Sequence, residues 1–458
     1  MSNEKHHISS SKSDQTHDVG VTERELRIEG LAVGGRGVGR VDGQVWFVSG
    51  AVPGDQVIAR SSRARARFVE AAVARRIVSS ADRREPPCRF QPDCGGCPWM
   101  VLDEPLQRRH KRELLIDTLR RIGGFEAPQL EPVVFGKASF GYRNKVEFRV
   151  RVDPSAGTLI GLQRPIAGDG LVDIDRCPLQ HSAANRVLAT VREWWNRPER
   201  SADEAGSHRL TLRRSWATGE MLVAVGQVGG RLPPIESLAR LLLRRHPDVV
   251  GVVCLVAVDG PRGRVRVRKV AGRDWIEEQL GEYRFRLPAA TFSQINPELG
   301  ARLIDAVVAA AGVRRGDRVL DLYGGTGAYG LHLAARGARV RVCDADASAI
   351  RCGRDAARRA RRSGIEFVHA DVLRFLRGDA GATDLVVANP PRAGLGRGVA
   401  GEIAGSGCRR IVLISCDPAS LARDLRALAG RGFRLERVIP FDLFPQTAHL
   451  EALAVMTR

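Results

Sequence analysis

Two side chains near the end of the chain could together supply a nucleophile and a proton acceptor. Cys416 follows the apolar run "RRIVLIS" and precedes Asp417-Pro418, so it stands at the end of a predicted strand. Taken alone it would more often be a core residue, because free cysteines are among the most buried residue types. Glu451 lies among apolar residues in "AHLEAL", where a carboxylate is costly to bury without a partner or a function. The surroundings of Cys416 must therefore decide between packing and catalysis.

A glycine-rich loop lies upstream of Cys416, in "RVLDLYGGTGAYGLHLA". It places Gly324, Gly325 and Gly327 between a strand and a helix, where glycines allow a tight turn and a close approach to a ligand. Asp344 ends the next strand, 23 residues after Asp321, and is placed to hydrogen-bond ribose hydroxyls. The loop lacks the G-x-G-x-x-G spacing of dinucleotide sites, and an acid at the position of Asp321 is typical of S-adenosylmethionine sites. The pattern favours a methyltransferase.

The next two strands end in polar residues. Asp371, in "HADV", is placed either to contact an adenine or to cap the following helix. Asn389 begins "NPPRAGL", where two prolines stiffen the loop and make the asparagine a fixed polar reader of a base. Asn-Pro-Pro also occurs in enzymes that methylate exocyclic amines, but there an aromatic residue follows, whereas Arg392 follows here. A thiol and a carboxylate beside a methyl donor instead suit C5 of a pyrimidine, which is not nucleophilic until a group adds to C6.

Four cysteines have spacings that suit a metal site. The run "CRFQPDCGGC" gives Cys88-x5-Cys94-x2-Cys97, and Cys177 follows far downstream in "DIDRCPLQ". Four thiolates can bind zinc or an iron-sulfur cluster, and the spacing does not separate the two. The remaining partnerless cysteines are expected to be packing residues, namely Cys254, Cys343, Cys352 and Cys408.

Charge and composition point to a polyanionic partner. The 458 residues include 72 basic and 52 acidic side chains, a net charge of +20, and only six of the basic residues are lysines. Arginine suits phosphates and stacked bases, so RNA is the expected partner, and no obligate protein partner is evident. No segment approaches the ~18 apolar residues needed to cross a bilayer, and the first twenty residues are polar. We expect a cytoplasmic protein with no membrane partner.

Four regions are expected along the chain. Residues 1–20 are predicted to be a flexible tail, and 21–82, with short strands and turns, a small β-barrel. Residues 83–285 read as an α+β central region, including a helix at about 103–122 that is expected to pack on the catalytic domain. Residues 286–458 alternate strands and helices, which predicts a doubly wound, Rossmann-like parallel sheet with a terminal hairpin. The fold class is therefore α/β.

The chain resembles the RNA uracil-5-methyltransferase family, in the branch with an N-terminal TRAM domain and an iron-sulfur cluster. The motifs "GYRNKVEF", "TFSQIN", "DLYGGTG", "NPPRAGL", "ISCDP" and "HLE" stand in the family's order. The resemblance implies 5-methyluridine formation, with 23S rRNA as the expected substrate. It implies that Cys416 attacks C6 of the uracil and that Glu451 removes the C5 proton.

The resemblance also implies two cofactors and the residues that hold them. A [4Fe-4S] cluster is expected on Cys88, Cys94, Cys97 and Cys177. The residues expected around S-adenosylmethionine are Gln294, Tyr323, Gly324, Gly327, Asp344, Asp371 and Asn389.

Three positions depart from the family's pattern. Asn389 stands where an aspartate is usual, Gly325 where a cysteine is usual, and Ala328 where an asparagine is usual. An asparagine can still accept a hydrogen bond from uracil N3–H and donate one to O4, so uracil recognition is retained. The alternatives are a tRNA uridine C5-methyltransferase, an amine or cytosine methyltransferase, and an inactive RNA-binding iron-sulfur protein.

Overall fold

The chain divides into two compact units, residues 1–84 and 85–458. The structure is a computed structural model that describes residues 22–91, 93–153, 157–165, 170–197, 205–230, 232, 234–257, 265–378 and 380–458. The predicted tail, residues 1–20, lies outside the described residues. Within the described ranges, no helix combines the length and the apolar character needed to cross a membrane.

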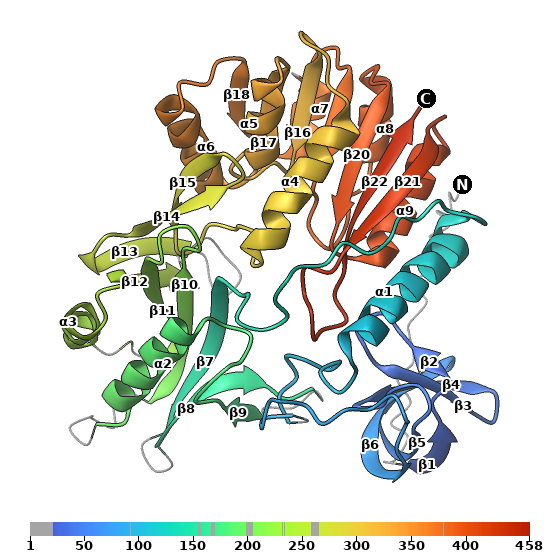
Figure 1. The fold of residues 1–458 in the computed structure, drawn as a ribbon, viewed down its shortest axis with the longest axis vertical. Helices are drawn as coiled ribbons and strands as arrows, with labels where there is room; N and C mark the ends of the chain where they lie inside the picture. Colours follow the sequence, from blue (N-terminus) through green and yellow to red (C-terminus); the bar gives the residue numbers. More distant parts are fainter. Residues whose placement is uncertain are drawn as a thin grey trace, which may run out of the picture. The chain divides into compact units, whose positions relative to one another are not determined.

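The first unit is the predicted small barrel, formed by one six-stranded sheet in the order β1-β5-β6-β4-β3-β2 (Figure 1). Alternating apolar residues such as Leu26, Trp46 and Val57 fill its interior. Asp55 is fully buried and accepts hydrogen bonds from the backbone of Ser80 and from the Arg83 guanidinium. The strands are β1 Glu23–Arg27, β2 Gly30–Leu31, β3 Gly37–Val41, β4 Gln44–Ser49, β5 Gln56–Ala64 and β6 Phe68–Val78.

The second unit contains a mixed sheet in the order β13-β12-β11-β10-β7-β8-β9. Helices α2 (Ser182–Trp195) and α3 (Glu236–Arg245) pack against it and bury an aromatic and aliphatic core. The strands are β7 Lys145–Asp153, β8 Gly157–Gln163, β9 Leu171–Asp173, β10 Gly206–Arg214, β11 Met221–Gly230, β12 Val249–Ala257 and β13 Val265–Gly272.

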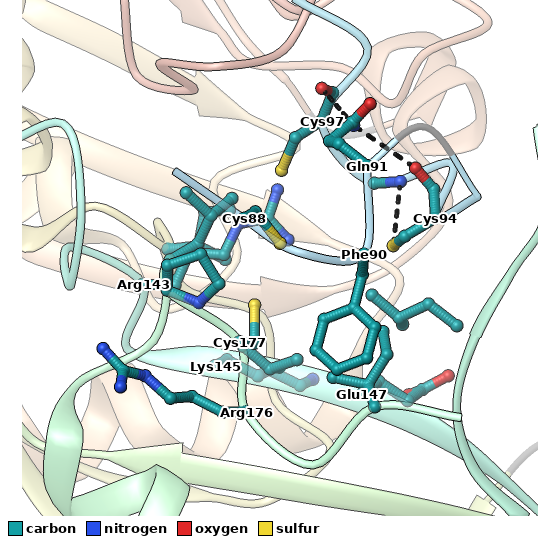
Figure 2. A pocket seen from close by; sticks show the side chains of 17 residues that line it. Cys88, Phe90, Gln91, Cys94, Cys97, Arg143, Lys145, Glu147, Arg176 and Cys177 are labelled. Carbon is teal, nitrogen blue, oxygen red and sulfur yellow. Dashed lines mark hydrogen bonds between the residues drawn. The ribbon is translucent and has the colours of Figure 1, made fainter. Parts of the chain in front are cut away.

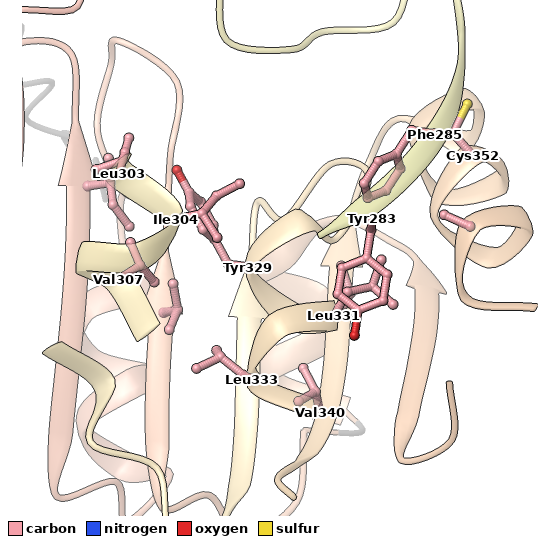
Figure 3. Close-up of a cluster of buried hydrophobic side chains, with 14 of the residues drawn as sticks. Tyr283, Phe285, Leu303, Ile304, Val307, Tyr329, Leu331, Leu333, Val340 and Cys352 are labelled. Atoms are coloured by element: carbon pink, nitrogen blue, oxygen red, sulfur yellow. The ribbon is translucent and has the colours of Figure 1, made fainter. Parts of the chain in front are cut away.

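A separate hairpin, β14 (Trp275–Leu280) and β15 (Tyr283–Pro288), follows the mixed sheet. Figure 3 shows Tyr283 and Phe285 of β15 in the same apolar cluster as residues of α4 and α5. The domain border expected at 285/286 therefore runs through β15, a strand whose side chains belong to the core of the last sheet, which contains β16 to β22.

The last sheet is the predicted doubly wound sheet, in the order β18-β17-β16-β19-β20-β22-β21. Its first five strands are parallel, and β22 inserts antiparallel between β20 and β21. The strands are β16 Arg318–Leu322, β17 Arg339–Asp344, β18 Ile365–His369, β19 Leu385–Ala388, β20 Arg410–Ser415, β21 Arg434–Phe441 and β22 Glu451–Thr457. The helices are α4 Pro297–Ala311, α5 Ala328–Ala335, α6 Ala347–Arg359, α7 Val372–Gly378, α8 Val399–Gly405 and α9 Pro418–Ala429.

The predicted helix at 103–122 is α1, Glu104–Thr118, followed by a π-helical turn, Leu119–Gly123. Asp103 caps its start by accepting a hydrogen bond from the backbone N–H of Leu106 at 2.8 Å. Leu115 and Leu119 are buried in the core that α9 shares, so this helix packs on the catalytic sheet. The chain then runs alongside β21, where residues 130 and 134 form bridges with Val438 and Phe441.

Candidate active site

The glycine loop, residues 323–327, connects β16 to α5 and leaves no room for side chains at two of the predicted positions. A Cβ atom on Gly324 would lie 2.8 Å from Cγ of Asp321, and one on Gly327 would lie 2.6 Å from the Phe367 ring. Gly327 also has a positive φ of 70°, which favours glycine. Gly325 has a φ of 56° but open space around it. The turn is therefore tight where it meets the sheet and open where a ligand would approach.

Two carboxylates support this loop from below. Asp344, at the end of β17, accepts hydrogen bonds from the backbone N–H of Gly325 at 2.8 Å and of Asp346 at 2.7 Å. Asp321 is fully buried and accepts one from the N–H of Gly330 at 2.9 Å, while its Oδ1 has no partner among the described residues. Burial raises the pKa of Asp321 to about 7, although the hydrogen bond from Gly330 acts to lower this pKa. An unpaired buried acceptor under the loop fits a ligand that donates a hydrogen bond or carries a positive charge.

Asp371 and Gln294 lie at this site with their side chains partly engaged. Asp371 is exposed and accepts a hydrogen bond from the backbone N–H of Arg374 at 3.0 Å. It therefore caps α7, which is one of the two roles expected for it from the sequence; the other is contact with an adenine. The backbone carbonyl oxygen of Gln294 accepts a hydrogen bond from Nδ2 of Asn144 at 3.1 Å. The Gln294 side chain makes a polar contact with the buried hydroxyl of Tyr329 in α5.

Tyr323 connects the glycine loop to the proline loop, residues 389–395, and Asn389 is the first residue of that proline loop. Tyr323 has a positive φ of 55°, an unfavourable backbone conformation for a non-glycine residue that is often found at functional sites. Its hydroxyl donates a hydrogen bond to the carbonyl oxygen of Leu395 in "NPPRAGL". Asn389 donates its backbone N–H to Leu322 at 3.2 Å, and its side-chain amide has no partner among the described residues. The amide of Asn389 is therefore available to a ligand.

Cys416 and Glu451 face each other at the same edge of the sheet. Ser415, the last residue of β20, pairs with Ala452 of the antiparallel strand β22, so the adjacent Cys416 stands opposite Glu451. Cys416 is partly buried, while Glu451 is only 3% exposed. Burial raises the pKa of Glu451 to about 8. The pKa of Cys416 is also raised, mainly by burial and to a smaller extent by the negative charge of Glu451. The predicted nucleophile and base are thus neighbours in space.

Arg392 and His449 complete this cluster, and neither was assigned a role from the sequence. Charge interaction with Arg392 opposes the burial effect on the pKa of both Cys416 and Glu451. Its Nη2 lies 3.3 Å from each ring nitrogen of His449. Burial and the nearby Arg392 lower the pKa of His449 to about 4, so the neutral ring can accept a hydrogen bond from Arg392. The position of Arg392 after a proline-stiffened strand end was a usable signal, whereas nothing near His449 marked it.

Asp417, the residue that follows Cys416, has a structural role. Its Oδ1 accepts a hydrogen bond from the backbone N–H of Ser420 at 2.7 Å and caps α9. Cys416 consequently lies at the N-terminus of a twelve-residue helix, whose dipole favours a thiolate. The positive influences on this thiol are therefore the helix end and Arg392.

The four predicted metal-ligand cysteines line one cavity of about 290 Å³ in the central region. Figure 2 shows the sulfur atoms of Cys88, Cys94, Cys97 and Cys177 around a common space. All four are free thiols. Burial raises the pKa of Cys94, Cys97 and Cys177, and the Arg143 guanidinium opposes this effect at each of them. Within the described ranges, no three His, Cys, Asp or Glu side chains are arranged to hold a single metal ion.

Family models match two parts of the chain, and known proteins match nearly its whole length. Residues 262–458 match the model described as tRNA (Uracil-5-)-methyltransferase, and residues 20–74 match the TRAM domain. An uncharacterized RNA methyltransferase of Thermotoga maritima is 32% identical over 448 residues, covering 95% of this chain and 99% of that protein. One of Gloeobacter violaceus is 36% identical over 447 residues, covering 94% and 95%.

A solved structure agrees with this assignment. The tRNA (uracil-54, C5)-methyltransferase of Pyrococcus abyssi, in complex with S-adenosyl-L-homocysteine, has a TM-score of 0.73 and 25% identity, covering 95% of this chain and all of that one. These matches confirm the family and the TRAM domain that the sequence motifs indicated. The chain therefore belongs to the RNA uracil-5-methyltransferase family, enzymes that act on RNA with S-adenosylmethionine as the methyl donor.

Proposed function

We propose that this enzyme methylates C5 of a uridine through a covalent bond between Sγ of Cys416 and C6 of the base. The observation that supports this best is the strand register, which sets Cys416 opposite the buried Glu451 at the sheet edge where the glycine loop lies. A nucleophile and a base on opposite strands, with a cation beside them, suit a reaction that adds to a ring and later removes a proton from it.

The proposed cycle begins and ends with the thiolate of Cys416. The thiolate of Cys416 adds to C6, forming the S–C6 bond and moving the C5=C6 electron pair into an enolate at O4. C5 would then form a bond to the methyl group that S-adenosylmethionine supplies when bound, and the S–CH3 bond of the donor would break, with its electron pair left on the sulfur of S-adenosylhomocysteine. Glu451 as carboxylate removes the remaining C5 proton, the C5=C6 bond re-forms, and the S–C6 bond breaks to release the thiolate.

Arg392 is suited to stabilise the two anions of this cycle. Its positive charge favours the ionised forms of both Cys416 and Glu451. The contact with the neutral ring of His449 limits the positions that its guanidinium can take. Asn389, with a free amide at the end of β19, would read N3–H and O4 of the uracil.

The residues proposed to hold S-adenosylmethionine surround the glycine loop. Gly324 and Gly327 allow the backbone to approach the ligand, and the unpaired Oδ1 of Asp321 can accept a hydrogen bond from it. Asp344 would bind the ribose while it supports the loop, and Asp371 would contact the adenine. Gln294, Tyr323 and Asn389 would line the remaining sides.

We propose 23S rRNA as the substrate, acted on in the cytoplasm. The arginine-rich TRAM barrel and the cysteine-bearing central region favour a large folded RNA, in which the target uridine leaves its stack at a cost of roughly a few kcal/mol. A second candidate is tRNA, because the similar Pyrococcus abyssi enzyme is a tRNA methyltransferase. Mapping 5-methyluridine in both RNAs from cells with and without this gene separates them: loss of a modified site in 23S rRNA alone is expected.

We also propose that the cysteine cavity holds a [4Fe-4S] cluster. The cavity presents four free thiols and a nearby cation, and it has room for a group larger than one ion. A zinc ion on the same four thiolates is the alternative, because four cysteines can bind either group. Protein purified without oxygen should be coloured and contain iron and sulfide, and Cys97→Ser should lose both; a colourless protein with one zinc ion would contradict the proposal.

The covalent step is tested with RNA that contains 5-fluorouridine. Fluorine at C5 cannot be removed as a proton, so the enzyme and RNA should stay joined after denaturation. Cys416→Ala should form no adduct, whereas Cys408→Ala, a substitution in the buried core, should form it. An adduct with the Cys416 variant would contradict the assignment, and methylation without any adduct would favour amine chemistry. Failure of the wild type to bind labelled S-adenosylmethionine would favour an inactive RNA-binding protein.

A further inference from the structure

The segment that follows Cys97 is joined to the loop that leads into Glu451. Residues 442–450 connect β21 to β22, and Glu451 is the first residue after them. The backbone N–H of Trp99 donates a hydrogen bond to the carbonyl oxygen of Gln446 at 3.2 Å. Two segments more than 300 residues apart in the chain are thus in direct contact.

Gln107 of α1 makes most of this connection. Its Oε1 accepts a hydrogen bond from the backbone N–H of Gln446 at 2.8 Å, and its Nε2 donates to Oε1 of Gln446 at 3.1 Å. The carbonyl oxygens of Trp99 and Leu102 each lie 2.9 Å from the same Nε2, so the two hydrogens of this group are shared among three acceptors. Both glutamines are fully buried. The side-chain amide of Gln107 therefore joins the segment after Cys97, helix α1 and the loop at residues 442–450.

Two further buried contacts hold the same loop. Lys111, one helical turn after Gln107, pairs with Asp442 and donates to the carbonyl oxygen of Phe444 at 3.1 Å. The hydroxyl of Tyr142 donates to the carbonyl oxygen of Pro445 at 3.2 Å. Side chains from outside the sheet thus bind the loop at successive positions.

The loop itself has a backbone conformation that requires support. Gln446 has a positive φ of 72°, which a non-glycine residue seldom adopts and which persists only where surrounding contacts enforce it. His449 lies three residues further on and contacts Arg392. Glu451 pairs with Phe441, the residue at the other end of the loop. The position of this loop therefore sets where Glu451 meets the substrate.

We propose that residues 97–111 form a strap that positions the catalytic base, with Gln107 as its central positioning residue. The inference rests on the proposed role of Glu451 as the base. Without the strap, the loop would relax and Glu451 would lose its alignment with the C5 proton, although S-adenosylmethionine binding and attack by Cys416 would continue. Removal of the C5 proton is thus the step that the strap controls.

The test is Gln107→Met, which keeps the side-chain volume and removes every hydrogen bond of the amide. The matched control is Gln279→Met, at an exposed glutamine that donates one bond to Gly281. On uridine RNA the Gln107 variant should show kcat reduced by about ten- to a hundred-fold, the cost typical of a misplaced catalytic group. Its affinity for S-adenosylmethionine should match that of the control.

The decisive readout is the intermediate. Because proton removal becomes slow, a methylated RNA–protein adduct that survives denaturation should accumulate on ordinary uridine RNA, which a general loss of stability would not produce. Unchanged kcat, or reduced kcat without that adduct, overturns the proposal. If Gln107→Met does not fold, Gln107→Asn, with its amide one methylene short, should accumulate the same adduct, and wild-type turnover there overturns it. Absence of a 5-fluorouridine adduct in the wild type would instead refute the proposed function.

Discussion

Glu451→Gln should make the catalytic domain more stable while it stops turnover. The Glu451 carboxyl is buried at the sheet edge, and among the described residues Arg392 is the charged neighbour that favours its ionised form. A carboxylate in this position is costly because burial removes its hydration. The amide of a glutamine has a similar shape and no charge to desolvate. The substitution should therefore relieve a cost that the native site retains for catalysis.

The size of the effect follows from the pKa of Glu451, which burial raises to about 8 from an ordinary 4.5. Between these pH values the folded protein keeps a proton that the unfolded chain has lost, so the free energy of unfolding falls as the pH rises. Each pH unit in this window costs ~1.36 kcal/mol. The full cost is at most about 5 kcal/mol above pH 8, and about 3 kcal/mol of it is present at pH 7.

The assay is urea unfolding of both proteins at several pH values from about 5 to 8. Other titrating groups are common to the two proteins, so the difference in their free energies of unfolding isolates Glu451. This difference should grow in favour of the variant as the pH rises. A difference that stays constant with pH, or that favours the wild type at pH 8, would refute the reasoning. In parallel, the variant should accumulate the methylated adduct on uridine RNA.

Three further results are expected. Cys416→Ala should abolish methylation yet bind S-adenosylmethionine as the wild type does, as measured by equilibrium binding. Arg392→Met should shift adduct formation with 5-fluorouridine RNA to higher pH, because the positive charge that lowers the pKa of Cys416 is lost; an unchanged pH profile would exclude this role. Gly327→Ala should weaken S-adenosylmethionine binding far more than Gly325→Ala, since the added methyl group would meet the Phe367 ring at 2.6 Å in the first case and open space in the second. Equal losses in the two glycine variants would show that positive φ, and not the lack of space, governs the loop.

The local parts of the site could be predicted from the sequence because they depend on neighbouring residues. Apolar runs of four to six residues followed by glycine or acidic residues identified the parallel strands and the glycine loop. Cys416 could be placed at a strand end for the same reason. That it faces Glu451 could not be predicted from these runs, since it depends on β22 inserting antiparallel between β20 and β21. Strand order is set by packing across the whole sheet.

The parts that were missed depend on contacts between distant segments. His449 has no local pattern, and its role arises only where the loop before β22 meets the proline loop that carries Arg392. Likewise, Asp417 is next to Cys416 in the chain, yet its carboxylate caps α9, while Arg392, 24 positions earlier, influences the thiol. Sequence distance was therefore a poor guide to the electrostatics of the nucleophile.

The buried carboxylates Asp55, Asp321 and Glu451 fall into two groups, according to whether neighbouring residues in the protein stabilise their charge. Asp55 in the barrel is as buried as Asp321, but Arg83 and two backbone N–H groups satisfy it, and these bonds hold its pKa below its usual value despite burial. Asp321 keeps one unpaired oxygen, and Glu451 has a raised pKa with only Arg392 opposing burial. A fold gains nothing from a buried acid that lacks partners. We propose that Asp321 and Glu451 gain partners from the ligand and the substrate, and the amino-acid type alone could not distinguish them from Asp55.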